Sequence, residues 1–393
     1  MKHILYCEWD EFTKEDALEI FPQLGYDTEM IHYEWRNLGK DEEFAEELTK
    51  RLQKTENGKA YFSFVFSYNF FPVVSQVCEK MSLPYISLVF DSPFYPLTST
   101  EINNSVNHIY TFDRKQVEEV KKQGITTIHY SPLPVNGPRI TKQTSALADL
   151  PYEHEVTFLG QLYRGEYDFY DQMHDTLPVG LRGALDGLVA AQSQVFGQDL
   201  IGNPDILSDK VIDELHSHVK FELSGRFKLD ERVLLRDMIR RKVTKNERWD
   251  LMERLGRVAN VDLYSFPYDV FPAGVTPKGY ADYVKEMPRI FNRSKINLNL
   301  TLRTIISGIP LRVTDVLAAG GFLITTYQEE IAAQFVDGDE LVLAYTPNDL
   351  CEKCSWYLQN DAERERIAAN GRKKVQKQFD YLKILSDIIK KSL

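Results

Sequence analysis

Several features are scarce or missing in this 393-residue sequence, and each absence excludes a class of protein. The 4 cysteines are too few and too scattered for a disulfide framework. No apolar run approaches the roughly 20 residues that a membrane-spanning helix needs, so we expect no membrane span. No internal repeat or low-complexity tract is visible. The N-terminus lacks an apolar signal segment with a cleavage site, so we expect a cytoplasmic protein.

The sequence also has an excess of negative over positive charge and lacks a complete set of the cysteine or histidine spacings typical of metal sites. The net charge is −11, from 47 basic and 58 acidic residues, which argues against a nucleic-acid partner held by a general basic field. Cys351 and Cys354 form a C-x-x-C pair in a charged helical stretch, where we expect ordinary helix residues rather than a redox or zinc site. His216 and His218 lie two positions apart and point to different helix faces. We therefore expect no metal and no cofactor.

What is present is globular composition, with 43% hydrophobic and 12% aromatic residues in a length that suits two domains. From residue 1 to about 135, short apolar runs alternate with amphipathic helical stretches. This rhythm predicts an α/β domain with a parallel, doubly wound sheet. The expected strands are Ile4–Glu8, Thr28–His32, Tyr61–Ser67, Tyr85–Phe90, His108–Phe112 and Thr127–Tyr130.

The rest of the chain predicts a second α/β domain. Residues 136–151 combine proline, glycine and a polar run and are expected to be a linker. The second domain spans residues 152–375 and begins with a strand at Glu155–Leu159. A helical insertion is expected at about 166–256, where arginines one turn apart indicate a solvated helix face. Residues 376–393 form a terminal helix with an apolar face, expected to return to the first domain.

The most informative stretch runs from Ser294 to Tyr327 and has the pattern strand, loop, helix, strand. Gly308 permits close backbone approach to a ligand, and the helix that follows offers free N–H groups to a phosphate. Arg303 and Arg312 flank the turn and are candidates to neutralise a diphosphate. Asp315 is placed to accept hydrogen bonds from ribose hydroxyls. The alternative is that Arg312 and Asp315 form a surface pair and that Gly308 only ends a strand.

The run S-G-I-P-L-R-V-T-D-V-L-A-A-G-G-F-L-I-T resembles the donor-site signature of group 1 glycosyltransferases, most closely the spore-maturation-protein CgeB-like branch. Glu330 to Tyr345 continues this resemblance, and Phe62 to Pro93 resembles the N-terminal domain of the same branch. The helical stretch from about 166 to 256 carries no recognised motif. The resemblance implies a GT-B architecture, in which two Rossmann-like domains face each other across a cleft, the first binding acceptor and the second nucleotide sugar.

The resemblance also implies a set of donor contacts. Arg164 lies in the first loop of the second domain, which approaches the diphosphate in this architecture, although a solvated arginine is the alternative. Glu329 and Glu330 resemble the acidic pair after the last strand, although acids also stabilise a helix N-terminus without a ligand. Ser307 stands where retaining enzymes usually carry a sugar-binding glutamate, so the donor sugar and the retention of configuration stay open. The expected donor site is Arg164, Arg303, Ser307, Gly308, Arg312, Asp315, Glu329 and Glu330.

Two strand-end loops of the first domain are candidates for the acceptor side, because ligands of such sheets bind beyond the carboxyl ends of strands. Asp91 is the best-placed carboxylate and is the expected catalytic residue. Tyr68, Asn69 and Tyr95 are the expected acceptor contacts. The alternative is that Asp91 belongs to a turn and that the aromatic side chains close the core.

Together these features predict a metal-independent, retaining glycosyltransferase of hexosyltransferase type. Its donor is expected to be a nucleotide sugar, UDP-linked, and its acceptor a glycan, protein or small molecule. A non-catalytic nucleotide- or glycan-binding module would also explain the missing glutamate at Ser307. A nucleotide-sugar epimerase is a third reading, which would need a catalytic histidine that the strand-end loops of the second domain do not offer.

Overall fold

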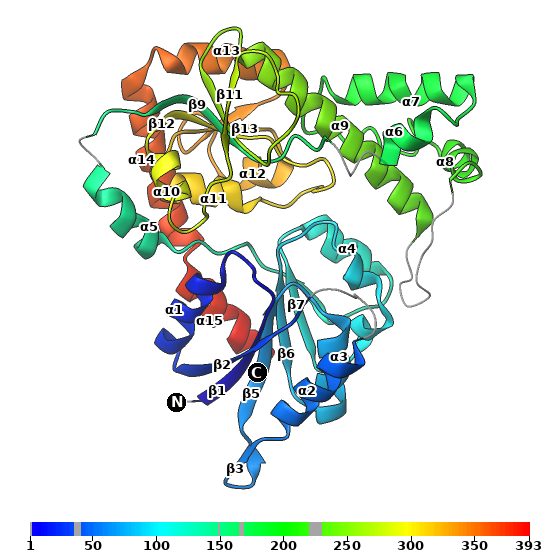
Figure 1. The fold of residues 1–393 in the computed structure, drawn as a ribbon, viewed down its shortest axis with the longest axis vertical. Coiled ribbons are helices and arrows are strands. Elements are labelled where there is room, and N and C mark those ends of the chain that lie inside the picture. The colour runs from blue at the N-terminus through cyan, green and yellow to red at the C-terminus, as the bar shows by residue number, and fades with distance from the viewer. Residues whose placement is uncertain (1, 35–40, 148–149, 165–168, 220–229) are drawn as a thin grey trace. The chain divides into compact units, whose positions relative to one another are not determined.

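The computed structural model describes residues 2–34, 41–147, 150–164, 169–219 and 230–393 (Figure 1). These residues divide into two compact units. Unit 1 is built from residues 2–134 together with Phe379–Leu393, and unit 2 from residues 135–378. Each unit contains a six-stranded sheet whose strands pair in parallel. The predicted fold class of two Rossmann-like α/β domains is therefore confirmed.

The sheet of unit 1 has the strand order β2-β1-β5-β6-β7-β8. Its central strands are buried on both faces, as near-continuous apolar runs require; Ile4, Leu5 and Tyr6 of β1, for example, are all 0% exposed. The six predicted strands are all present, with ends that differ by a few residues. They are β1 (Lys2–Glu8), β2 (Tyr26–His32), β5 (Phe62–Tyr68), β6 (Tyr85–Val89), β7 (Asn107–Thr111) and β8 (Ile128–Tyr130).

Helices complete unit 1 and connect its parallel strands. Asp41 and Asp113 cap two of these helices by accepting hydrogen bonds from backbone N–H groups. The C-terminal helix α15 (Tyr381–Ser392) also belongs to this unit, where Tyr110 Oη lies 3.0 Å from Ser392 Oγ. The other elements are α1 (Lys14–Gln23), α2 (Glu42–Leu52), α3 (Pro72–Met81), η1 (Tyr95–Thr98), η2 (Thr100–Asn103), α4 (Arg114–Lys122) and the small hairpin β3 (Thr55–Glu56) and β4 (Lys59–Ala60).

The sheet of unit 2 has the order β11-β10-β9-β12-β13-β14, so the strand order reverses between β9 and β12. The edge strand β11 was missed by the sequence analysis because four of its five residues are exposed and give no apolar run. The strands are β9 (His154–Leu159), β10 (Val261–Tyr264), β11 (Val275–Gly279), β12 (Ser294–Asn299), β13 (Leu323–Thr326) and β14 (Val342–Ala344).

The helices of unit 2 include the predicted insertion, whose described part is helical and has a small core of its own. Insertion helices are α6 (Phe169–His174), α7 (Val179–Gln192), α8 (Asp209–His216) and α9 (Glu231–Leu255). The remaining elements are α5 (Gly137–Thr144), η3 (Ser145–Leu147), α10 (Met287–Asn292), α11 (Leu311–Ala318), α12 (Glu329–Gln334), α13 (Pro347–Leu358) and α14 (Asp361–Gln378).

Two expectations need correction. The predicted linker at 136–151 contains helix α5, because Asn136 caps its first turn by accepting a hydrogen bond from the Arg139 N–H at 3.1 Å and Pro138 suits that turn. The arginine face of α9 is not uniformly solvated either. Arg240 is only 9% exposed and pairs with Asp199 at 2.7 Å and Asp237 at 3.0 Å.

The remaining composition-based expectations concern cysteines and membrane helices. Cys351 and Cys354 lie on α13 with free thiols. Burial raises the pKa of the Cys351 thiol, which disfavours the reactive thiolate. Within the described ranges, no helix is both long and apolar enough to cross a membrane.

Candidate functional site

The point where the strand order of unit 2 reverses marks the candidate site. In an open parallel sheet, the loops after the two strands at this point diverge and leave a crevice beyond their carboxyl ends. Here those strands are β9 and β12. The loop after β9 carries Gly160–Arg164, and the loop after β12 carries Arg303, Ser307 and Gly308. The fold thus brings most of the predicted donor residues to the carboxyl ends of the strands of one sheet, which we call the β9–β12 edge.

Arg248 on α9 holds these two loops together. Its guanidinium donates hydrogen bonds to the carbonyl oxygens of Gln161 and Leu300, one in each loop. Arg248 is only 8% exposed, and burial lowers the pKa of its guanidinium. The sequence analysis missed this residue, because its position in a charged helix gave no sign of partners on two distant loops.

Tyr163, in the loop after β9, has a strained backbone. Its φ of 55° lies in the left-handed region, which bulky side chains rarely adopt. The Arg248 guanidinium lies 5.1 Å from the centre of the Tyr163 ring. Such strain persists only where the surroundings enforce it, and it is concentrated at ligand-binding sites. The conformation of this loop is therefore a second indicator of function at the β9–β12 edge.

Arg303 does not have the open position that the sequence suggested. Its Nε donates to both carboxylate oxygens of Glu247, at 2.9 and 3.0 Å, and its Nη2 donates to the Val195 carbonyl at 2.7 Å. The side chains of Arg303 and Glu247 are 15% and 6% exposed. The charge of Arg303 is thus neutralised inside unit 2, and the residue is assigned to a buried ion pair instead of a diphosphate contact.

The turn at Ser307–Gly308 leads directly into α11. Ser307 and Gly308 are buried, and Pro310 is the N-cap with φ −64° and ψ 149°. The helix N-terminus at Leu311 carries a partial positive charge, because its first N–H groups lack helical partners. This is the geometry of an anion-binding turn, and Ser307 contributes no negative charge to it.

Arg312 and Asp315 follow within one helical turn. Arg312 is half-buried, its guanidinium carbon lies 5.2 Å from the centre of the Phe291 ring, and burial lowers its pKa to about 10, opposed by the nearby Asp315. Arg312 therefore remains a cation at neutral pH. Asp315 is 5% exposed and accepts a hydrogen bond from the Tyr283 hydroxyl at 3.0 Å. The sequence analysis did not single out Tyr283, which lies in a turn just before α10.

Three further predicted residues lie at the same sheet edge. Arg164 is exposed and its guanidinium carbon lies 3.5 Å above the Trp249 ring, which holds a cation at the loop after β9. Glu329 and Glu330 begin α12 after β13; Glu329 is exposed and Glu330 is buried. The Gln328 side chain connects the segment after β13 to the loop after β12 by donating a hydrogen bond to the Ile305 carbonyl at 2.9 Å.

An exposed aromatic pair also lies at this edge and was not singled out from the sequence. Phe266 follows β10 and Tyr280 follows β11, and they are 52% and 67% exposed. Their rings are nearly parallel, with an interplanar angle of 18° and centroids 6.4 Å apart. Exposed, parallel aromatic rings are a suitable surface for stacking a flat heteroaromatic ring.

In unit 1 the strand order reverses between β1 and β5, and the candidate acceptor residues cluster near that point. Asn69 directly follows β5 in a left-handed conformation with φ 57°. Its side chain donates to Asp91 Oδ2 at 2.9 Å and accepts from the Phe90 N–H at 3.0 Å. Asn69 is 0% exposed, so it orients Asp91 and is not a direct acceptor contact. Asp91 itself is exposed.

The two predicted acceptor tyrosines have different environments. Tyr68 is 0% exposed, and its hydroxyl is hydrogen-bonded to the Tyr381 hydroxyl of α15. Tyr68 is therefore a core residue, and its prediction as an acceptor contact is wrong. Tyr95 begins η1 and is partly exposed, which leaves its prediction open.

A polar group at the ends of β1 and β2 was also missed. Among the described residues, Glu8, Asp10 and His32 are the group with metal-ligand geometry, with ligand atoms within 4.8 Å of one another. Lys14 donates to Glu8 at 2.9 Å, and this hydrogen bond raises the pKa of Lys14. The ammonium group thus already supplies positive charge there. His32 Nδ1 lies 2.8 Å from Glu8 Oε1, which makes His32 a second candidate base on this edge.

Comparison with known proteins identifies the architecture. Residues 232–390 match a family model described as glycosyl transferase-like, which covers the segment from α9 to α15. No curated protein sequence matches the chain. The structure is similar to an α-glucosyltransferase solved with UDP-glucose and DNA containing an abasic site, with TM-score 0.53, 9% identity, and coverage of 99% of this chain and 98% of that one. The chain has the GT-B fold.

Two further GT-B structures support this assignment. A glycosyltransferase from Rickettsia africae has TM-score 0.52 and 9% identity, with 100% of this chain and 97% of that chain covered. AviGT4, a glycosyltransferase involved in avilamycin A biosynthesis, has TM-score 0.52 and 11% identity, again with 100% and 97% covered. At such low identities the similarity establishes the GT-B fold and leaves the reaction to be argued from the site.

Proposed function

We propose that this protein is a glycosyltransferase that moves a hexose from a nucleotide sugar bound by unit 2 to an acceptor bound by unit 1. The observation that carries the proposal is the Gly308 turn into α11, with Arg312 and Asp315 beside it, at the edge where the strand order reverses. This segment lies within the region that matches the glycosyl transferase-like model. Membership of the CgeB-like branch is part of the proposal and rests on the run from Ser307 to Thr325.

The residues of unit 2 suggest how the donor is held. The diphosphate would bind at the N-terminus of α11 beside Arg312, and Arg164 would approach it from the loop after β9. Asp315 would exchange its hydrogen bond from Tyr283 for hydrogen bonds from the ribose hydroxyls. The Phe266–Tyr280 pair would stack the base. A UDP-linked donor is favoured by analogy with the α-glucosyltransferase that was solved with UDP-glucose.

A direct test is calorimetric titration of the full-length protein with UDP-, GDP-, dTDP- and CMP-sugars. Binding of one nucleotide class, with release of its free nucleotide when acceptor is added, supports a transferase. Binding without turnover under any acceptor condition would favour the non-catalytic binding module, for which Ser307 in place of a carboxylate is the specific observation. An epimerase is not proposed, because the described strand ends at this edge of unit 2 carry no histidine.

Nucleotide binding is expected to be independent of divalent metal. The leaving diphosphate can be neutralised by Arg312, Arg164 and the α11 N-terminus, which perform the electrostatic role of a metal ion. Titration with UDP in the presence of EDTA should give the same affinity as in the presence of magnesium or manganese. A loss of binding in EDTA that is restored by added metal would show that these groups are insufficient.

Asp315→Ala should weaken nucleotide binding by about 1.5 to 3 kcal/mol, the range for a hydrogen bond to a charged group. The matched control is Tyr283→Phe. It removes the hydroxyl that donates a hydrogen bond to Asp315 and keeps the carboxylate that would bind the ribose. We expect Tyr283→Phe to bind UDP at least as well as the wild type. Unchanged affinity in Asp315→Ala would assign this carboxylate to the packing of α11 alone.

A further inference from the structure

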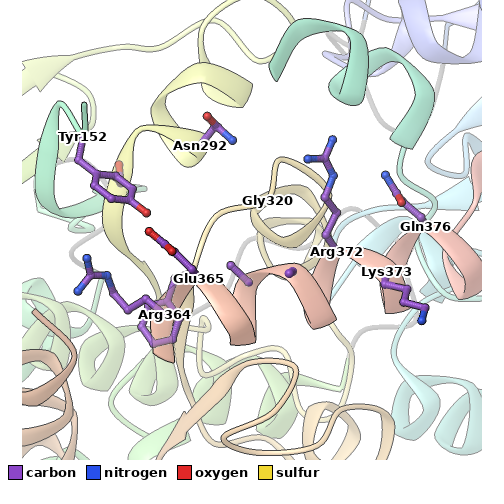
Figure 2. Close-up of a pocket in the computed structure, with 12 residues that line it drawn as sticks. Tyr152, Asn292, Gly320, Arg364, Glu365, Arg372, Lys373 and Gln376 are labelled. Carbon is purple, nitrogen blue, oxygen red and sulfur yellow. The ribbon is translucent and has the colours of Figure 1, made fainter. Parts of the chain in front are cut away.

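A pocket in unit 2 lies at the end of the strands opposite to the α11 turn. It has a volume of ≈ 330 Å³, and its wall includes Ser294, the first residue of β12, and Phe322, which precedes β13. The strands are parallel, so these residues mark the N-terminal edge of the sheet, opposite the edge that holds the candidate donor site. Helix α14 forms another wall through Glu365, Arg372 and neighbouring residues (Figure 2).

Arg372 is the feature that makes this pocket a candidate anion site. Within the described ranges its guanidinium has no carboxylate partner; its Nη2 donates to Thr141 Oγ1 at 3.0 Å. The residue is half-buried, and burial lowers its pKa. A partly desolvated cation without a counter-charge is unfavourable, and an anionic ligand would remove that penalty. Figure 2 shows the Arg372 guanidinium projecting into the pocket.

The other side of the pocket is polar and carries the opposite charge. Figure 2 shows Arg372 and Gln376 on one side and the Tyr152 hydroxyl and Glu365 carboxylate on the other, with Asn292 between them. No ion pair of Glu365 is present in the described part of the chain. A carboxylate, a phenol and amides form hydrogen bonds readily with the hydroxyl groups of a sugar. The pocket thus offers a cation at one end and hydroxyl-binding groups at the other.

We propose that this pocket binds a small phosphate ester of a polyhydroxy compound, such as a sugar phosphate. The phosphate would pair with Arg372, and Lys373 at the rim would add a second positive charge although its amine points outward in Figure 2. Glu365, Tyr152 and Asn292 would accept or donate hydrogen bonds to the hydroxyl groups. The volume is at the lower end of the range for small-molecule sites, about 300 to 1,000 Å³, which suits such a ligand.

This pocket is separate from the proposed donor site, because the pocket lies at the N-terminal ends of the strands and the donor site at their carboxyl ends. The pocket also borders the contact between helices α14 and α5 within unit 2. Arg372 and Gln376 near the end of α14 donate to Thr141 of α5. A ligand on Arg372 would therefore act directly on the contact between α5 and α14.

The test is calorimetric titration of the full-length protein with glucose 6-phosphate, with and without saturating UDP. Inorganic phosphate and glucose serve as probes for the two halves of the ligand. We expect glucose 6-phosphate to bind equally well in the presence of UDP and more tightly than either half. Arg372→Gln should weaken binding of glucose 6-phosphate about 10- to 100-fold, as expected for a charge-assisted hydrogen bond. Lys377→Gln also replaces a cationic side chain of α14 with glutamine, but this residue does not line the pocket. It should leave the affinity for glucose 6-phosphate unchanged.

A second variant keeps the test decisive if Arg372→Gln does not fold. Glu365 is exposed, so Glu365→Gln should fold normally, weaken binding of glucose 6-phosphate and spare that of inorganic phosphate. The proposal is overturned if glucose 6-phosphate does not bind, if UDP displaces it, or if both pocket variants bind it like the wild type. Binding of L-glutamate in preference to glucose 6-phosphate would overturn the assignment of ligand class.

Discussion

Replacing Asp91 with asparagine should lower sugar transfer by about 10²- to 10⁴-fold, the usual contribution of a positioned general base. Asp91 is exposed just beyond β6, and Asn69 holds its carboxylate through a hydrogen bond of 2.9 Å. Asn69 is itself fixed by the Phe90 N–H, so the carboxylate is oriented before the acceptor arrives. Nucleotide binding should not change, because the donor residues belong to unit 2.

Steady-state kinetics with acceptor and donor varied separately would measure this effect. The matched control is Asp27→Asn, the same chemical change at a 58% exposed side chain near the other end of the unit 1 sheet, which should retain activity. If transfer proceeds with retention and the donor phosphate takes the proton, Asp91 only positions the acceptor and the loss appears mainly in acceptor KM. Unchanged kcat and KM would remove Asp91 from the site.

His32 provides the competing assignment for the base. It is oriented by Glu8 at 2.8 Å, as a catalytic histidine would be, and it lies at the end of β2 on the same sheet edge. His32→Gln should have a smaller effect on kcat than Asp91→Asn if Asp91 is the base. The reverse order would transfer the role to His32.

Arg303→Met should destabilise unit 2 by about 3 to 5 kcal/mol, the cost of leaving one partner of a buried ion pair uncompensated. The partner left behind is Glu247, whose carboxylate is 6% exposed. Adding Glu247→Gln to Arg303→Met should recover part of this loss, because the double variant buries no unpaired charge. Arg164→Met, the same substitution at an exposed arginine, should change stability by less than about 0.5 kcal/mol.

Urea unfolding of the four proteins, followed by fluorescence, would measure these differences. The result also decides between two roles for Arg303. If Arg303 were instead a surface residue that contacts the diphosphate, Arg303→Met would change stability little and would strongly lower the affinity for nucleotide. An Arg303→Met protein that is as stable as the wild type but does not bind UDP would restore the role that the sequence suggested.

The sequence was sufficient to predict most strands of the two sheets because the central strands are buried on both faces. The predicted strands Ile4–Glu8 and Glu155–Leu159 reappear as β1 and β9, most of whose residues are buried. The strand β11 was missed because it is an exposed edge strand. Its sequence, V-T-P-K-G, contains proline and glycine, which in isolation indicate a loop.

The candidate site was predictable only where its residues lie close together in the sequence. The Gly308 turn and Asp315 are close in sequence, so their pattern was visible. Arg303 depends on Glu247, 56 positions away, and Tyr68 depends on Tyr381, 313 positions away. No local pattern shows that such partners will meet. The same limitation hid Arg248, whose two carbonyl partners lie on loops that only the folded sheet brings together.

The most direct test of the central claim is the release of free nucleotide (UDP, GDP, dTDP or CMP) from sugar-labelled UDP-glucose, and from the corresponding GDP-, dTDP- and CMP-sugars, by the full-length protein in EDTA. Water or an added sugar can serve as acceptor. The account predicts that one donor class is cleaved without metal and that Asp315→Ala requires a higher donor concentration for the same rate. Donor binding that never leads to cleavage of the sugar–phosphate bond would contradict it.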